Sequence, residues 1–188
     1  MKIQTYFKVA LVASAFLSAN FAFPQMEKTK MVGGSAMYPS KNIVENAVNS
    51  VDHTRLVAAV KAAGLVETLQ SKGPFTVFAP ENSAFDKLPK GTVETLLKPE
   101  NKAQLQAVLT YHVVAGKMGS KEIAGAIKKG NGKAMLTTVQ GGTLTASMKG
   151  KDLYITDENG GQSKVTIADV FKSTGLLHAV DTVVLPKM

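Results

Sequence analysis

The sequence predicts an α+β domain in which helices cover one part of a mainly antiparallel sheet. Two kinds of pattern lead to this prediction. Apolar residues recur at helical spacing in the first half of the chain, over 43–48, 56–63 and 105–111. In the second half, alternating apolar and polar residues over 143–148 indicate a strand with one buried face. Helices are therefore expected mainly before strands along the chain.

Residues that favour helix ends flank the helical segments. Asp52 can cap the helix over 56–63, because its carboxylate can accept hydrogen bonds from free backbone N–H groups, and Gly64 is the natural end of that helix. Pro99 is expected to open the helix that continues to Tyr111, since proline fits the first helical turn. Each helix therefore has its own predicted start or stop.

The strands are predicted from apolar runs and from turns. The segment 75–79 follows the breaker pair Gly73-Pro74 and carries apolar residues on both faces, so a strand buried on both sides is expected. The alternating strand at 143–148 is expected to form a hairpin with 153–156. A last strand is expected over 179–185.

The N-terminus has the order of positive charge, short apolar run and small residues that is typical of a secretory signal peptide. Residues 1–22 are expected to be this signal, and the protein is expected to be secreted or periplasmic with no membrane insertion after cleavage. Residues 23–38 are polar and include Gly33-Gly34-Ser35, so a flexible leader is expected there. The folded domain is expected to span 39–188.

Composition excludes several classes of function. Hydrophobic residues make up 45% of the chain and charged residues 19%, which excludes a wholly disordered protein. The formal net charge is +8, yet Arg55 is the one arginine, and the scattered lysines are typical of a solvated surface rather than a nucleic-acid groove. The charge excess favours an acidic partner. The absence of cysteine excludes disulfides and thiolate metal sites.

Two long motifs and one dipeptide carry a resemblance to a known family. The first motif begins with the predicted buried strand and includes Phe75, Thr76, Val77, Phe78, Ala79, Pro80, Asn82 and Phe85. The second lies near the C-terminus and includes Gly175, His178, Asp181, Leu185 and Pro186. Tyr111-His112 lies between them. In this order the three resemble the signatures of the fasciclin (FAS1) family, and most closely its small, single-domain secreted bacterial members.

The resemblance implies a wedge-shaped β-sandwich with helices packed on one side, and a role in cell adhesion or extracellular binding. From the residues themselves, both long motifs are expected to serve the architecture, because they consist of buried, periodic segments. Tyr111 and His112 have two interpretations: a binding surface, as the resemblance suggests, or an interior pair whose polar atoms need partners. The interior interpretation is favoured. His53 is expected to be exposed at a helix start.

Catalytic patterns are missing from the sequence, and no enzyme, cofactor or metal site is predicted. There is no Gly-x-Ser-x-Gly motif, and the three histidines are far apart in the chain. His178 and Asp181 fall on opposite faces of a predicted strand, so they do not hold one metal together. The pair Asp157-Glu158 is expected at an exposed turn made by Asn159-Gly160-Gly161.

Two functions from different classes remain open. The leading hypothesis is a non-enzymatic adhesion or binding module that recognises a cell-surface or extracellular protein, glycan or envelope component through its surface. The alternative is a small-molecule carrier with an apolar pocket of a few hundred Å³ between helices and sheet. The sequence does not define the ligand, the binding face or the oligomeric state.

Overall fold

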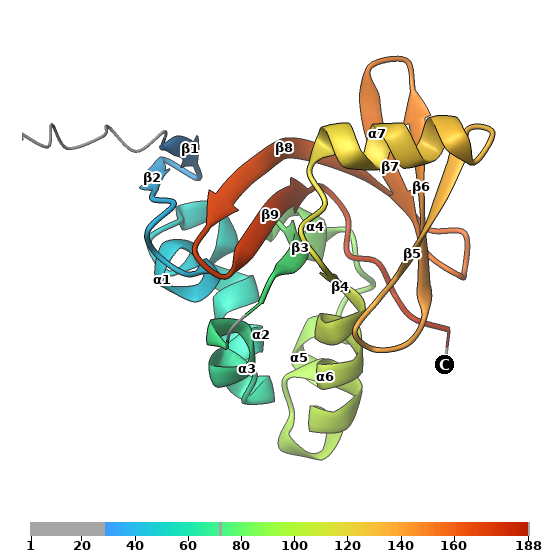
Figure 1. Ribbon diagram of the computed structural model, residues 1–188. Coiled ribbons are helices and arrows are strands. Elements are labelled where there is room, and N and C mark those ends of the chain that lie inside the picture. Colours follow the sequence, from blue (N-terminus) through green and yellow to red (C-terminus); the bar gives the residue numbers. More distant parts are fainter. Residues whose placement is uncertain (1–28, 72, 188) are drawn as a thin grey trace, which may run out of the picture.

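The computed structural model describes residues 29–71 and 73–187, and it sets a group of short helices against a strongly curved sheet (Figure 1). The expected signal peptide, residues 1–22, lies outside the described residues. The elements in chain order are β1 (Lys30–Val32), β2 (Ser35–Met37), α1 (Ile43–Ala47), η1 (Val51–His53), α2 (Thr54–Ala63), α3 (Val66–Gln70), β3 (Phe75–Pro80), α4 (Asn82–Asp86), α5 (Thr92–Leu96), η2 (Pro99–Asn101), α6 (Lys102–Tyr111), β4 (Val113–Ala115), α7 (Ser120–Lys129), β5 (Lys133–Thr137), β6 (Thr143–Lys149), β7 (Asp152–Thr156), β8 (Gln162–Lys172) and β9 (Gly175–Val180).

The main sheet has seven strands in the order β4-β3-β9-β8-β7-β6-β5. Strands β3 and β9 run parallel, and every other neighbouring pair in this sheet is antiparallel. The two outer strands approach each other at a bridge between Val114 and Thr138, where the Val139 N–H donates to the Val113 carbonyl at 2.7 Å. The sheet is therefore nearly a closed barrel, and the prediction of a mainly antiparallel α+β domain is confirmed, with helices α1 to α6 packed on one side of the sheet.

The core has two parts that meet at β3. Val77 points into a cluster made mainly with helices α1 to α6, whereas Phe78 points into a cluster enclosed by α7 and the curled strands β5 to β8. In Figure 1, helices α1 to α3 lie on one side of β3 and β9, and helix α7 with strands β5 to β7 lies on the other. Because side chains alternate along a strand, one short segment contributes to both clusters, and the prediction of a strand buried on both sides is confirmed.

Helix ends follow the expected chemistry at some positions and differ at others. Gly64 ends α2 in the left-handed region with φ of +71°, which favours glycine. Pro99 opens η2, which leads directly into α6. Asp52 does not cap α2. It lies within the 3₁₀ turn η1, and the N-cap residue of α2 makes no side-chain hydrogen bond to the helix.

The leader prediction is wrong for residues 30–37. This segment forms the antiparallel β1–β2 hairpin, and Val32 and Met37 are buried in the cluster shared with the helices. A side chain at Gly33 would have its Cβ 2.1 Å from the Ser50 hydroxyl, so the glycine there permits a close approach. Gly33-Gly34, which resembles a flexible linker in the sequence, is thus the turn of a hairpin that packs against the helices.

The last strand lies earlier than expected. Strand β9 covers Gly175–Val180 and pairs with β3 from Phe75 opposite Gly175 onward, while residues 181–187 are not part of the ladder. At Gly175, φ is +151° and a Cβ would lie 1.9 Å from the Phe75 carbonyl oxygen. Glycine is therefore required where the second motif enters its strand.

Candidate functional site

Tyr111 lies in the last turn of α6 and is fully buried, at 0% exposure. Its hydroxyl donates to the Thr143 carbonyl at 2.8 Å and accepts from the Glu158 N–H at 3.2 Å. Burial raises the pKa of this phenol above its usual value, so it remains protonated. Tyr111 thereby joins α6 to the start of β6 and to the turn after β7.

His112 is the C-cap residue of α6 and is also buried. Its Nδ1 lies 2.8 Å from the Val108 carbonyl, and the Val184 N–H donates to Nε2 at 3.2 Å. Because a carbonyl only accepts and an amide N–H only donates, these partners require the neutral ring with its proton on Nδ1. Burial lowers the pKa of His112 to about 4, which agrees with this state.

The buried polar residue of the first motif, Thr76, connects β3 to the segment that follows β4. Thr76 is buried in β3, where its hydroxyl donates to the Gly116 carbonyl at 2.7 Å and accepts from the Met118 N–H at 2.8 Å. These bonds hold the segment that leads from β4 to α7 against the strand. Pro80 is the last residue of β3, and Phe85 returns to the core from α4.

His178 stacks on Phe78 with ring centroids 5.5 Å apart and joins the two motifs. Its Nε2 donates to the Met118 carbonyl at 3.0 Å, and Nδ1 accepts from the Asp169 N–H at 3.3 Å. Burial lowers the pKa of His178, so this ring is also neutral at pH 7. Both of its nitrogens are committed to the backbone.

Asp181 interacts with different groups from His178. Its carboxylate accepts from the Lys164 N–H at 2.9 Å and pairs with Lys87 at 3.1 Å. Within the described ranges, no group of three or more His, Asp or Glu side chains is placed to hold a metal ion. The structure therefore does not bring His178 and Asp181 together as a ligand pair.

Two residues that the sequence predicts at the surface, His53 and Asp157, are buried. His53 is 2% exposed, and its Nδ1 lies 2.9 Å from the Ser50 hydroxyl, because the 3₁₀ turn η1 directs the ring inward. Asp157 is 9% exposed and accepts from the N–H groups of Gly161 at 2.7 Å and of Leu185 at 3.0 Å. Asp157 therefore organises the turn and anchors the C-terminal segment, and it does not form a carboxylate dyad with Glu158.

Asn82 has a role that sequence reasoning missed. Helix α4 begins at Asn82, but the Asn82 side chain reaches α2, where Oδ1 accepts from the Arg55 N–H at 3.0 Å. Its Nδ2 also donates to the Val51 carbonyl at 2.8 Å. The cap that α2 lacks locally therefore comes from the first motif, and only tertiary structure could reveal it.

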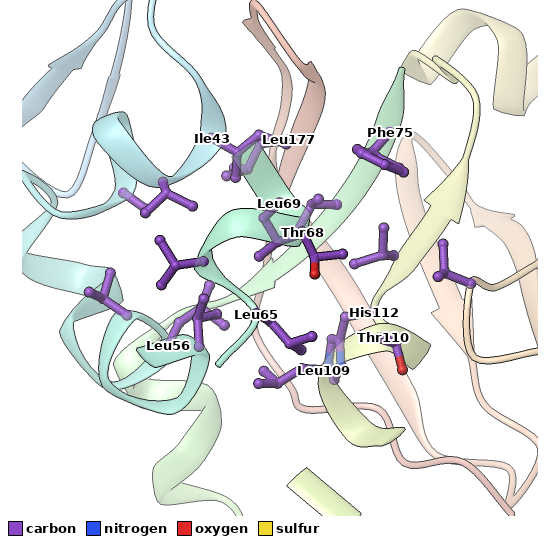
Figure 2. Close-up of a pocket in the computed structure, with 18 of the residues that line it drawn as sticks. Ile43, Leu56, Leu65, Thr68, Leu69, Phe75, Leu109, Thr110, His112 and Leu177 are labelled. Carbon is purple, nitrogen blue, oxygen red and sulfur yellow. The ribbon is translucent and has the colours of Figure 1, made fainter. Parts of the chain in front are cut away.

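An apolar cleft lies between the helices and β3 (Figure 2). It encloses a cavity of about 60 Å³. Its lining residues come from α1 to α3, α6 and the strands beside them: Ile43, Val44, Ala47, Leu56, Val57, Val60, Lys61, Leu65, Val66, Thr68, Leu69, Phe75, Val77, Phe78, Leu109, Thr110, His112, Val113, Val139 and Leu177. The cavity lies where the carrier hypothesis requires it but is smaller than a few hundred Å³.

The walls of the cleft offer few free polar groups. His112 lies in the wall beside Leu109 (Figure 2), but both of its ring nitrogens already have backbone partners. The Thr110 hydroxyl donates to the Gln106 carbonyl at 2.7 Å. Lys61 is exposed at the rim and is the one charged residue among the described lining residues. The arrangement can hold an apolar group.

The fold, with its helical wedge on one side of a nearly closed sheet, is that of a FAS1 domain. The solved structure of the FAS1 domain pair from the insect cell adhesion molecule fasciclin I aligns with a TM-score of 0.70 at 15% identity, over 79% of this chain and 52% of that chain. The sequence model of the fasciclin domain matches residues 51–186, and the chain belongs to this family.

Several relatives from different organisms match the chain. Protein sll1483 of Synechocystis is 42% identical over 86% of this chain and 83% of its own length. Immunogenic protein MPB70 of Mycobacterium bovis is 33% identical over 74% of this chain and 66% of its own length. Human periostin is 30% identical over 69% of this chain, which corresponds to only 14% of periostin. None of the helices in the described part of this chain is both long and apolar enough to cross a membrane.

Proposed function

We propose that this protein is a non-enzymatic binding module that acts outside the cytoplasm and recognises a protein, glycan or envelope component through its surface. One observation carries the proposal: the most distinctive motif side chains are in the interior. Tyr111, His112 and His178 are each exposed by 2% or less, and their polar atoms are bonded to backbone groups. These side chains support the fold, and the outer surface is left for recognition.

The names of relatives and the charge of the chain support this proposal. One relative is a cell surface glycolipoprotein of Mycobacterium bovis, and the solved FAS1 pair comes from a cell adhesion molecule. The chain has 22 Lys and Arg against 14 Asp and Glu, and Lys121, Lys128 and Lys129 are exposed on α7. A positively charged surface attracts acidic partners, and added salt screens this attraction so that it acts over shorter distances.

The test is a binding assay of the exported protein against envelope fractions and an immobilised anionic polysaccharide. We expect retention on the polysaccharide to fall as the salt concentration rises, and the Lys128→Gln/Lys129→Gln variant to elute earlier than the wild type. Retention that does not respond to salt would refute the acidic-partner part of the proposal. Tyr111→Ala and His112→Ala separate contact from structure, because loss of binding at an unchanged melting temperature would assign this pair to a contact surface.

A second candidate function is a carrier of small apolar molecules, and the apolar cleft favours it. Binding sites for small molecules are concave and mostly apolar, with a few polar groups that set orientation. The cleft has this composition, and partly exposed Val44, Val57 and Phe75 border it. A neutral, environment-sensitive dye such as N-phenyl-1-naphthylamine tests this function, since its fluorescence rises on entering an apolar site. A dye signal no larger than that of an unrelated folded protein would exclude the carrier.

A further inference from the structure

We propose that the cleft binds a fatty-acid-like amphiphile, with the hydrocarbon chain between α3 and α6 and the carboxylate at Lys61. This inference rests on the second candidate function and names its ligand class. It starts from the interior of the cleft, where the ring nitrogens of His112 and the hydroxyl of Thr110 already have backbone partners. The other lining hydroxyl, that of Thr68, belongs to an exposed residue of α3, so a polar group on the buried part of a ligand would lose its water without gaining a partner there. The buried part is therefore hydrocarbon.

Helix α3 forms one side of the cleft and is a short element. It has five residues, none of them fully buried, and no side-chain cap at its N-terminus. Leu65 and Leu69 hold it over the cavity, opposite Leu109 on α6 (Figure 2). A helix this short has no stability of its own, so its position depends on these apolar contacts.

The size of the cavity makes this displacement necessary. The cavity of about 60 Å³ is smaller than the ~150 Å³ that holds a benzene molecule in an apolar protein interior. An alkyl chain must therefore move α3 outward and replace the contacts of Leu65 and Leu69 with its own methylene groups. The exchange is between apolar surfaces, so it exposes no buried polar group of the described lining.

Lys61 gives the mouth of the cleft its charge. It lies in the last turn of α2, its side chain is exposed, and it forms none of the three ion pairs found among the described residues. Glu67 on α3 is exposed but does not line the cleft. An apolar interior with a cation at its mouth complements an anionic head on a hydrocarbon chain.

The first experiment compares dodecanoate with 1-dodecanol, which has the same chain and no charge. Each ligand is titrated, below its micellar concentration, against N-phenyl-1-naphthylamine bound to the full protein at pH 8, and its affinity is taken from the loss of dye fluorescence. We expect dodecanoate to bind about threefold more tightly, the size of an exposed ion pair. Lys61→Gln should remove this difference and leave the dodecanol affinity unchanged, whereas Lys98→Gln, an exposed lysine away from the cleft, should preserve the difference.

The second experiment locates the chain-binding part. Val44 lines the cleft from α1, whereas Val48, one helical turn later, is exposed and does not line it. Val44→Phe should fill the cavity and weaken both ligands at least tenfold, and Val48→Phe should leave both affinities unchanged. Melting curves show whether each variant is folded. If Val44→Phe does not fold, the relative affinity of the surface variant Lys61→Gln for dodecanoate and dodecanol still tests the inference.

The possible failures are distinguishable. If the dye binds but dodecanoate and dodecanol compete equally, the carrier function stands and the anionic ligand class is refuted. If Lys61→Gln leaves the preference for dodecanoate intact, the placement of the carboxylate is refuted. If the dye does not bind, or if Val44→Phe binds as the wild type does, the cleft is not the site and this inference falls.

Discussion

His112 and Tyr111 act at the residue scale as connectors between segments that are distant in the chain. His112 joins α6 to Val184, 72 positions later, and Tyr111 joins α6 to Thr143, 32 positions later. A buried polar atom that loses its partner costs more than the bond itself contributed, since the remaining group is cut off from water. The dipeptide is therefore a place where small changes should affect stability.

Tyr111→Phe tests this role by removing one oxygen atom while keeping the ring. The Thr143 carbonyl and the Glu158 N–H would both lose their partner, so we expect the free energy of unfolding to fall by about 1–3 kcal/mol. Urea denaturation measures the change. Tyr38→Phe is the matched control, because Tyr38 is 42% exposed, and it should change the stability by less than about 0.5 kcal/mol. Equal effects of the two variants would contradict the connector role.

Gly175 and Gly125 give opposite predictions for the same substitution. At Gly175 an added methyl would collide with the Phe75 carbonyl oxygen, so Gly175→Ala should destabilise the protein by about 3 kcal/mol or more. Gly125 lies within α7 with no atom within 4 Å of an added Cβ, so Gly125→Ala should stabilise it by about 0.5–1 kcal/mol. A Gly175→Ala variant that melts no lower than the wild type would contradict the geometry of β3 and β9, and a Gly125→Ala variant that melts lower would contradict the open position in α7.

At the element scale, α2 depends on a cap from another part of the chain. We expect Asn82→Ala to lower the free energy of unfolding by about 1–2 kcal/mol, because the Arg55 N–H and the Val51 carbonyl both lose their partner. Asn82→Asp keeps the acceptor and places a negative charge at the helix N-terminus, so it should recover part of this loss. Chemical denaturation compares the two variants, and an aspartate variant no more stable than the alanine variant would argue against capping.

Elements with a strong local signal could be predicted, and those fixed by distant contacts could not. Strand β3 and helix α6 follow from apolar patterns and from Pro99, which act within a few residues. The β1–β2 hairpin escapes prediction because its strands have three residues each and gain stability only by docking Val32 and Met37 onto the helices. The strand expected over 179–185 lies too late because Val183, Val184 and Leu185 continue the apolar pattern past the end of β9, whose register is set by the close contact at Gly175.

The candidate site shows the same division. The burial of Tyr111 and His112 could be favoured from the sequence, since polar side chains inside apolar segments need partners. His53 is expected at the surface because it lies at a helix start, and Asp157 because it lies beside turn-forming residues, but local composition does not show that either turn is covered. The apolar cleft is built from segments between Ile43 and Leu177 that come together only in the folded chain.

At the scale of the whole molecule, three buried histidines make the fold sensitive to acid. Burial lowers the pKa of His53, His112 and His178 below the usual value of 6.5. The unfolded chain therefore takes up protons that the folded protein excludes, and stability falls as the pH drops through 6.5 towards the folded values. Above pH 6.5 these groups are neutral in both states and have no such effect.

We expect the free energy of unfolding to decrease between pH 7 and pH 4, with His112 alone contributing roughly 3 kcal/mol because its pKa is lowered to about 4. Urea denaturation at several pH values measures the slope. Asp169 and Asp181, whose pKa values lie below the usual carboxyl value because hydrogen bonds outweigh burial, should extend the loss to still lower pH. A stability that is constant from pH 7 to pH 5 would contradict the burial of these rings.

Modification of the three histidines by diethyl pyrocarbonate at pH 7, followed by mass spectrometry, shows directly whether the Tyr111-His112 pair and the other histidine rings lie in the interior. The chain has only three histidines, and all of them lie in the described residues at 2% exposure or less. The account predicts that none is modified in the native protein and that all three react once urea unfolds it. Rapid modification of His112 in the folded protein would contradict the account, because it would place this part of the Tyr111-His112 pair at the surface.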